Sequence, residues 1–197
     1  MNLDHLTFPD IGWGYLPAQE DVWAAFRYAQ DNYNPKSVLE IGYHIGHSTT
    51  YQLEIYENAK IVGISPDNEK TGREGDRTDP ELRRSMEGVL KDKYFNRFQW
   101  IPGRTKDVRD ELEKFFFDFA LLDGSHSYED AHYDAKTCES LEIPNMLVDN
   151  WDQPAVRKAV EDTSYFPLKT FEYTQTFKGK TNTNSLALVT LDLRFNI

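Results

Sequence analysis

The stretch VLEIGYHIGHST, residues 38–49, passes from an apolar run through two glycines into a segment with helical spacing. Residues 37–42 read as a short strand buried on both faces, because Val, Leu and Ile occur there with little alternation. Gly42 and Gly46 permit a tight turn, and the helix after them offers free N–H groups at its start. The stretch therefore predicts a strand, a glycine turn and a helix, with room for a ligand where they meet.

The same alternation continues along the chain. Four more apolar runs are bounded by turn residues, at 60–65, 98–103, 117–124 and 145–150. Helical patterns follow the five runs, at 48–59 with Ser48 or Thr49 as its N-cap, and at 80–95, 107–115, 127–141 and 153–162. Five alternations of strand and helix predict a doubly wound, mostly parallel α/β sheet.

The two ends of the chain extend this sheet in different ways. Residues 18–31 carry apolar side chains on one helical face, which predicts a helix ahead of the first strand. Near the C-terminus, 169–177 and 185–193 read as strands, and the connection 178–184 is rich in Gly and Asn, so an antiparallel hairpin is expected. We therefore expect seven strands in one domain, 1–197, made of an N-terminal cap segment 1–35, a core 36–163 and a hairpin 164–197.

Composition restricts the class of protein. A length of 197 residues and a hydrophobic content of 39% are typical of one globular domain with a real core. The net charge of −11 disfavours a nucleic-acid backbone or an anionic membrane as main partner. The single cysteine, Cys138, lies in a predicted helix and favours a buried thiol. No apolar run approaches the ~20 residues of a membrane span, and no signal-peptide pattern is seen, so we expect a cytoplasmic protein.

Polar side chains follow the fourth and fifth predicted strands. Asp123 ends the fourth run, and Asp149 and Asn150 end the fifth. Because ligands of doubly wound sheets bind outside the carboxyl ends of the strands, these oxygens should converge in the ligand crevice. Two carboxylates and an amide oxygen suit Mg²⁺ or another hard divalent cation. The plainer alternatives are a turn at Asp123-Gly124 and a helix cap at Asn150.

The pattern E-x-G-x-x-x-G-x-S-T in the opening stretch resembles the first motif of class I S-adenosylmethionine-dependent methyltransferases, particularly the small-molecule O-methyltransferases. The resemblance implies that Glu40 lies near the methionine part of the cofactor, that Gly42 and Gly46 make room for it, and that Ser48 belongs to the same site. His44 and His47 flank the turn and are expected to line the cofactor pocket or to lie at the surface.

Two further turns belong to this expected cofactor site. The segment PGRTKD, 102–107, resembles the loop of catechol-type O-methyltransferases in which residues matching Thr105 and Lys106 flank the adenine, although a polar turn capping a helix at Asp107 explains it equally well. The second strand departs from the family, which usually places a ribose-binding acid at its end. Here Ser65 stands at that end and Asp67 follows two residues later.

The metal-dependent O-methyltransferases carry an Asp after the fourth strand and an Asp-Asn or Asp-Asp pair after the fifth, and Asp123, Asp149 and Asn150 match them. Asp123 is also expected to border the cofactor. The segment DGSHSYED, 123–130, resembles the group that includes macrocin-type sugar O-methyltransferases and cephalosporin hydroxylase relatives. In the sugar enzymes a histidine three residues after the metal aspartate is the general base, and His126 occupies that place. Without the resemblance, His126 reads as a surface residue that caps the next helix.

The sequence thus predicts an S-adenosylmethionine-dependent, cation-dependent O-methyltransferase that acts on a sugar-like or natural-product-like hydroxyl. One alternative is a non-catalytic subunit with the same fold that only binds the cofactor. Another is a nicotinamide-dependent oxidoreductase, which fits the sheet but not the glycine spacing.

The acceptor pocket has no readable motif. We expect it to be built by residues 8–17, with Trp13 and Tyr15, by the loop 67–79 and by the connection 178–184. Trp151 could wall this pocket or pack in the core. The chain is short for its class, so a homo-oligomer could complete the pocket.

Overall fold

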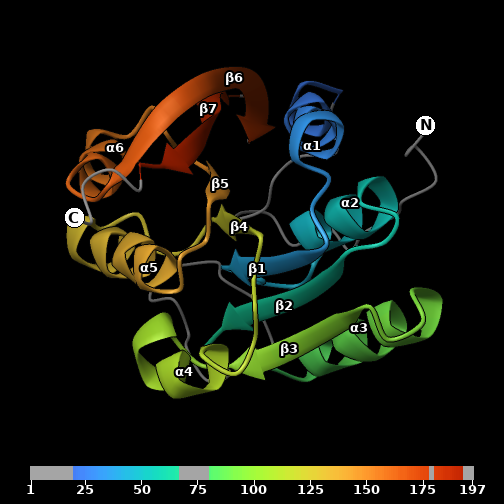
Figure 1. The fold of residues 1–197 in the computed structure, drawn as a ribbon. Coiled ribbons are helices and arrows are strands. Elements are labelled where there is room, and N and C mark those ends of the chain that lie inside the picture. Colours follow the sequence, from blue (N-terminus) through green and yellow to red (C-terminus); the bar gives the residue numbers. More distant parts are fainter. Residues whose placement is uncertain (1–19, 67–79, 178–179, 193–197) are drawn as a thin grey trace.

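The computed structural model describes residues 20–66, 80–177 and 180–192 (Figure 1). Its helices and strands, in chain order, are α1 Glu20–Tyr33, β1 Ser37–Ile41, α2 His47–Ile55, β2 Lys60–Ser65, α3 Pro80–Lys93, β3 Phe98–Pro102, α4 Thr105–Leu112, β4 Phe119–Leu122, α5 Tyr128–Ser140, β5 Asn145–Val148, α6 Pro154–Glu161, β6 Tyr165–Phe177 and β7 Lys180–Leu191. Asp67, the loop 67–79 that contains it, Trp13 and Tyr15 lie outside the described residues.

The strands form one mixed sheet in the order β3-β2-β1-β4-β5-β7-β6. The first five strands are parallel to one another, whereas β7 is antiparallel to both β5 and β6. This confirms the predicted doubly wound sheet with a C-terminal antiparallel hairpin. The chain order reverses between β1 and β4, which is the switch point where such sheets bind their ligands.

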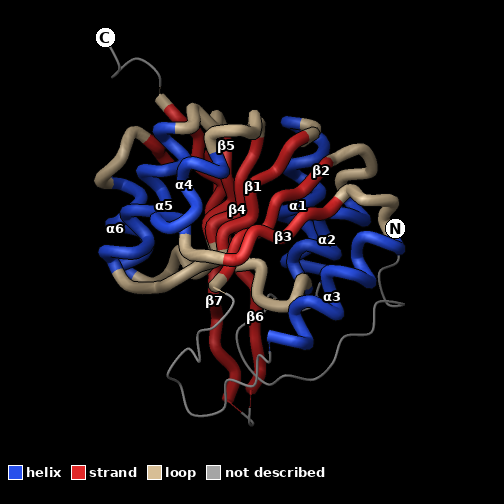
Figure 2. Tube along the Cα trace, turned by 90° about the horizontal axis from the view of Figure 1, so that it is seen from below, coloured by secondary structure: helices blue, strands red, loops and turns tan. Residues whose placement is uncertain are grey.

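Helices cover both faces of the sheet. In Figure 2, α1, α2 and α3 lie on one side and α4, α5 and α6 on the other. Successive strand residues point into opposite cores: Val38 packs with Phe26 on the α1 side, and Leu39 packs with Leu112 on the α4 side. Burial on both faces explains why the central strands are almost uniformly apolar in sequence. No helix among the described residues is long and apolar enough to cross a membrane.

Several predicted boundaries are corrected by the structure. Helix α2 starts at His47 after Gly46, which adopts the left-handed conformation at φ 86°, so neither Ser48 nor Thr49 is the N-cap. Helix α4 starts at Thr105, which puts Asp107 at its third position, where its carboxylate accepts a hydrogen bond from the Arg104 N–H.

The C-terminal hairpin is longer than predicted. Most of the expected connection 178–184 belongs to β7, which begins at Lys180, and β6 begins already at Tyr165. The Thr and Asn residues of this segment read as a loop by composition, but pairing with β6 makes them a strand.

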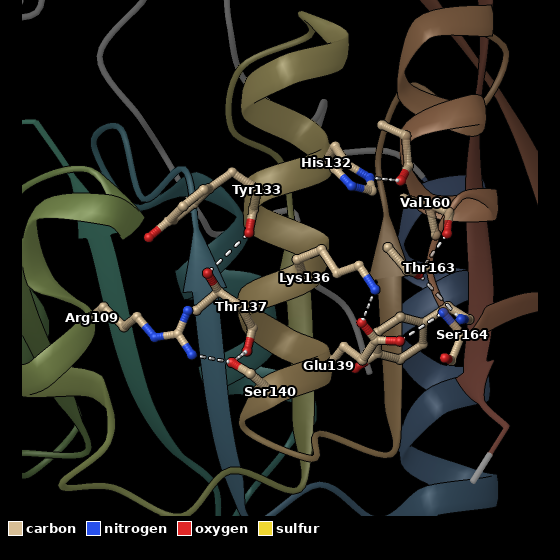
Figure 3. A network of polar contacts seen from close by, with 12 residues as sticks. Arg109, His132, Tyr133, Lys136, Thr137, Glu139, Ser140, Val160, Thr163 and Ser164 are labelled. Carbon is tan, nitrogen blue, oxygen red and sulfur yellow. Dashed lines mark hydrogen bonds and ion pairs between the residues drawn. The ribbon is translucent and has the colours of Figure 1, made fainter. Parts of the chain in front are cut away.

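Polar contacts hold α5 to its neighbours (Figure 3). The Arg109 guanidinium of α4 donates to the Ser140 hydroxyl at 3.0 Å, and the Glu139 carboxylate accepts from the Ser164 N–H at 2.9 Å. A His132 ring nitrogen lies 2.9 Å from the Ala159 carbonyl oxygen of α6. These contacts tie α5 to α4, to α6 and to the turn after α6.

Candidate active site

Two acidic residues, Asp123 and Asp149, follow the ends of β4 and β5 at the carboxyl edge of the sheet, next to the switch point. Ile41, Leu122 and Val148 are level in the strand register, so the residues after them, Gly42, Asp123 and Asp149, are level as well. The Asp123 N–H donates to the Ile41 carbonyl at 2.8 Å, and the Asp149 N–H to the Leu122 carbonyl at 2.9 Å, which continues the ladder by one residue.

Glu40 lies below this level on the same face. It stands two residues before Gly42, and strand side chains alternate between faces, so it shares a face with Asp123 and Asp149 one pleat deeper. The edge thus gathers three carboxyl groups on one side of the sheet.

Gly42 brings β1 and β4 together at this edge. Its φ is 105°, and a Cβ at this position would lie 1.9 Å from the Asp123 carbonyl oxygen. Only glycine permits such an approach, so the first glycine of the motif admits the neighbouring backbone that carries Asp123.

The Glu40 carboxylate is fully buried and accepts hydrogen bonds from the Ser48 and Thr49 hydroxyls in the first turn of α2. Burial raises its pKa to about 7, although both hydroxyl hydrogen bonds act in the opposite direction. The group is therefore close to half-ionised at neutral pH. The predicted residues Glu40 and Ser48 are in contact, and Thr49 completes their network.

The second glycine turn is packed by an aromatic group. A Cβ at Gly46 would lie 2.9 Å from the Tyr43 ring, which is buried against Phe98 with ring centroids 4.8 Å apart. His47, at the start of α2, is buried, and burial lowers the pKa of its imidazole to about 4, with a smaller contribution from His44. His47 is consequently neutral at pH 7 and adds no positive charge to the edge.

Asp123 and Asp149 are hydrogen-bonded to each other through their carboxyl groups. Burial and the neighbouring Asp149 raise the pKa of Asp123 well above its usual range, whereas the pKa of Asp149 is raised by burial to about 6. Asp149 also accepts a hydrogen bond from the Tyr173 hydroxyl of β6 at 2.8 Å. The closeness of the two acids therefore favours a proton on one of them.

Asn150 follows Asp149 in a left-handed conformation at φ 53° and is buried. Its N–H donates to the Asp149 carboxylate. Asn150 is not the N-cap of α6, because Gln153 occupies that position and donates its N–H to the Asn150 carbonyl at 2.9 Å. The predicted trio is thus brought together at the ends of β4 and β5.

His126 is partly exposed in the loop between β4 and α5, and its Nδ1 lies 3.3 Å from the Gln153 Nε2. The contact joins this loop to the start of α6. His126 is not the cap of α5, because the Ser127 hydroxyl accepts from the Asp130 N–H.

The remaining predicted residues lie at the ends of β2 and β3. Ser65 is buried, and its carbonyl accepts from the Gly103 N–H at 2.9 Å. Thr105 is buried and hydrogen-bonded to Asp134 of α5, while Lys106 is exposed. Thr105 therefore also ties α4 to α5.

Trp151 and Cys138 belong to the core on the α4 side. Of the two roles expected for Trp151, a wall of the acceptor pocket or core packing, the structure supports core packing. Within the described part of the chain, no group of three or more His, Cys, Asp or Glu is arranged to hold a metal ion. The predicted trio contains two carboxylates and one amide.

Two contacts of the site were missed by sequence reasoning. Tyr173 is one of several aromatics in an alternating strand, and no local pattern marks its reach to Asp149. Gln153 precedes Pro154 at a helix start, which predicts a capping position but not a contact with His126.

Residues 39–149, more than half of the chain, match the family model described as a methyltransferase domain. The chain belongs to this family, and it is an S-adenosylmethionine-dependent methyltransferase. The matched region begins next to Glu40 and ends at Asp149, so it contains all three acids of the edge, and Asn150 follows directly after it. No curated protein matches the sequence.

Solved structures share the fold at low identity. The O-methyltransferase TomG from Streptomyces achromogenes, involved in tomaymycin synthesis and solved with SAM (S-adenosylmethionine), has a TM-score of 0.60 and 16% identity over 92% of this chain and 83% of that chain. An O-methyltransferase from Bacillus cereus, solved with SAH, has a TM-score of 0.59 and 15% identity over 89% and 84%.

A precorrin-6y C5,15-methyltransferase from Geobacter metallireducens has a TM-score of 0.64 and 11% identity over 93% of this chain and 95% of that chain. Its name places the methyl group on carbon atoms. Because proteins with different accepting atoms share this fold, the acceptor of this chain has to be argued from the site itself.

Proposed function

We propose that the protein transfers the methyl group of S-adenosylmethionine to a hydroxyl oxygen of a small molecule, and that a divalent cation such as Mg²⁺ takes part. The observation that supports this most is the hydrogen-bonded pair of Asp123 and Asp149 at the switch point. Two enclosed carboxyl groups repel each other when both are ionised, and positive ligands relieve that repulsion.

The proposed cofactor site lies across the ends of β1, β2, β3 and β4. The acidic edge favours a positively charged sulfonium, and the start of α2 offers N–H groups to a carboxylate. The residues that we assign to this site are Glu40, Gly42, Gly46, Ser48, Ser65, Asp67, Thr105, Lys106 and Asp123. Of these, Glu40, Ser48, Ser65 and Thr105 are buried, so we propose that they support the site through the contacts described above.

The proposed cation site consists of Asp123, Asp149 and Asn150, whose donor set of carboxylate and amide oxygens fits Mg²⁺. A proton held by either carboxyl group would leave when a cation binds between them. A bound divalent cation would lower the pKa of a hydroxyl next to it and hold that hydroxyl in position.

His126 is the proposed general base. In the transfer the bond from sulfur to the methyl carbon breaks, a bond from oxygen to that carbon forms, and the hydroxyl proton passes to the imidazole. Gln153 can present its amide oxygen to Nδ1 after a 180° rotation of the amide, so that Nδ1 carries the hydrogen and Nε2 is the atom that would accept the proton.

For the acceptor we propose a sugar or a natural-product-like hydroxyl, because His126 matches the base of the sugar enzymes. We also propose a cytoplasmic location and a role for a second copy of the chain in completing the acceptor pocket.

The test is transfer of a labelled methyl group from S-adenosylmethionine to a panel of hydroxylated small molecules, with Mg²⁺ and with a chelator. We expect transfer with Mg²⁺ and loss of most of it with the chelator. Equal transfer in both would rule out the cation. Cofactor binding without transfer to any acceptor would favour a non-catalytic binding subunit.

A further inference from the structure

We infer that the part of the β6–β7 hairpin beyond the sheet is the acceptor-binding wall of the active site, and that its amide face recognises a molecule with several hydroxyl groups. This inference rests on the proposed methyl transfer to a hydroxyl. It assigns recognition to residues of the hairpin that neither the family match nor the motifs address.

The hairpin runs past the carboxyl edge of the sheet. Val148, the last residue of β5, pairs with Ala187 of β7, so the stretch of β7 from Lys180 to Leu186 and its partners on β6 lie beyond the end of β5. Figure 2 shows this two-stranded ribbon projecting from the sheet on one side. A two-stranded ribbon is only marginally stable by itself, so a function at this position is a reason to retain it.

The register places one face of the ribbon above the acid pair. Asp149 follows Val148 and is therefore level with Leu186, which pairs with Phe171. The next pair on the same face is Tyr173 with Asn184, and the pair after that is Gln175 with Asn182. Each pair lies about 7 Å further from the sheet edge than the one before.

Tyr173 fixes this face to the catalytic edge. Its buried hydroxyl donates to Asp149 at 2.8 Å, so the ribbon cannot shift without breaking a hydrogen bond to one of the two acids. Asn184 is partly exposed and Asn182 is exposed, and their amides lie beyond the tyrosine on that face. The acid pair and the two amides therefore follow one another along the same face of the ribbon.

The chemistry of this face suits hydroxyl groups. Each amide offers a donor and an acceptor, which matches a hydroxyl, and neither Asn182 nor Asn184 carries charge. A flat aromatic acceptor would be held by apolar and aromatic walls, which these amides do not supply. The face therefore favours a polyhydroxylated acceptor whose reacting hydroxyl lies at the acid pair and whose other hydroxyls lie along the ribbon.

The alternation of the strand provides a matched control. Thr183 lies between the two asparagines in sequence and points to the opposite face, where it pairs with Thr174. The variants Asn182→Leu, Asn184→Leu and Thr183→Val each remove one polar group from the same ribbon, and only the first two change the amide face.

The experiment uses the full chain with S-adenosylmethionine and Mg²⁺, with methyl hexosides as polyhydroxylated probes and catechol as the flat probe. Methyl transfer gives KM and kcat, and saturation-transfer NMR on the SAH-loaded protein reports hexoside binding without turnover. We expect each asparagine variant to raise KM or Kd for the hexosides roughly tenfold, because about one neutral hydrogen bond is lost. Thr183→Val should leave both constants unchanged.

The inference would be overturned by equal effects of the asparagine and threonine variants, or by binding of catechol and of no hexoside. Absence of all hexoside binding to a protein that binds its cofactor also overturns it. Titration with S-adenosylmethionine separates these outcomes from failure of the proposed function, because a protein that does not bind the cofactor fails at that step. Asn182 is exposed, so its variant tests the wall even if Asn184→Leu is poorly folded.

Discussion

The acids at the carboxyl edge belong to two regions, and each region holds its carboxyl groups with a different set of hydrogen-bond partners. Glu40 is buried at the end of β1, and both of its hydroxyl donors, Ser48 and Thr49, come from the helix that follows directly. Asp149, one pleat above, is held by Asp123 from β4 and by Tyr173 from the hairpin. The first network is local and complete within one strand-turn-helix unit, whereas the second is assembled from three separate strands.

The two sets of partners indicate whether each region can exchange a proton alone or can also bind a cation in its place. Glu40 shares its two hydrogen bonds with uncharged hydroxyls, so its protonation can change without loss of its partners. In the Asp123–Asp149 pair the closeness of the two carboxyl groups favours a proton on one of them, and a cation can replace that proton. We therefore assign shape and cofactor support to the β1 region, and cation binding and chemistry to the β4–β5 region.

Substitution of Asp149 should have the largest effect. Asp149→Asn keeps the shape but removes the charge that a cation needs, so we expect methyl transfer to fall by about 10⁴-fold, since a metal contributes several kcal/mol. The matched control is Asp152→Asn, an exposed acid three residues later, which should leave the rate within about twofold. A variant of Asp149 that retains wild-type, Mg²⁺-dependent turnover would remove this carboxylate from the site.

His126→Ala should slow turnover by roughly 10²–10⁴-fold, as expected for loss of a general base, and leave the affinity for S-adenosylmethionine unchanged. The control is His132→Ala, which removes a histidine of α5 that stacks on Tyr128 of the same helix and should keep the rate. Steady-state kinetics together with cofactor titration measure both quantities. Unchanged turnover of His126→Ala would exclude it as the base.

Titration of Glu40 should make the free energy of unfolding depend on pH. Its pKa in the folded protein is about 7, raised from the usual 4.5, so the folded state binds the proton more tightly than the unfolded state. Its contribution to stability is therefore fully present below pH 4.5 and lost as the pH rises through 7, by about 3 kcal/mol in total.

The measurement is denaturant unfolding of wild type and of Glu40→Gln between pH 4 and pH 8. The difference between the two proteins isolates Glu40 from other titrating groups such as His47, whose lowered pKa acts in the opposite direction. A difference that does not change with pH would show that Glu40 titrates normally.

Tyr173→Phe should have the smallest effect of the four substitutions. It tests whether the hairpin supports the acid pair through the Tyr173 hydroxyl. Loss of its hydroxyl leaves Asp149 less well oriented, so we expect Mg²⁺ affinity to fall about 10–100-fold while cofactor affinity stays constant. Tyr165→Phe is the control on the same strand, because its buried hydroxyl donates to the Ile143 carbonyl at 2.6 Å, away from the acids. Equal cation affinity in both variants would limit Tyr173 to a structural role.

The same contrast explains which features sequence reasoning could predict. The β1 unit depends on neighbours in sequence, so its strand, glycines and helix follow from residues 38–49. The strand ends that carry Asp123 and Asp149 were also predictable, because parallel strands end at one edge. The role of Gly42 in admitting the Asp123 backbone depends on the register between strands, which a motif does not express.

Long-range partners were not predictable. Tyr173 reaches Asp149 because β7 lies between β5 and β6 and brings the hairpin to the active edge, an order that composition does not reveal. The hairpin was also predicted too short, since the Thr-Asn segment was assigned to a loop by its residue types while cross-strand pairing makes it part of β7.

The central claim is that the switch-point edge binds S-adenosylmethionine next to a cation site, with Asp123 at the border of the two. Calorimetric titration of the purified protein with S-adenosylmethionine, with Mg²⁺ and again with a chelator, tests it most directly. The account predicts binding on the order of micromolar Kd in both conditions, and the same binding by Asp149→Asn. Absence of binding by a folded sample in both conditions would contradict it.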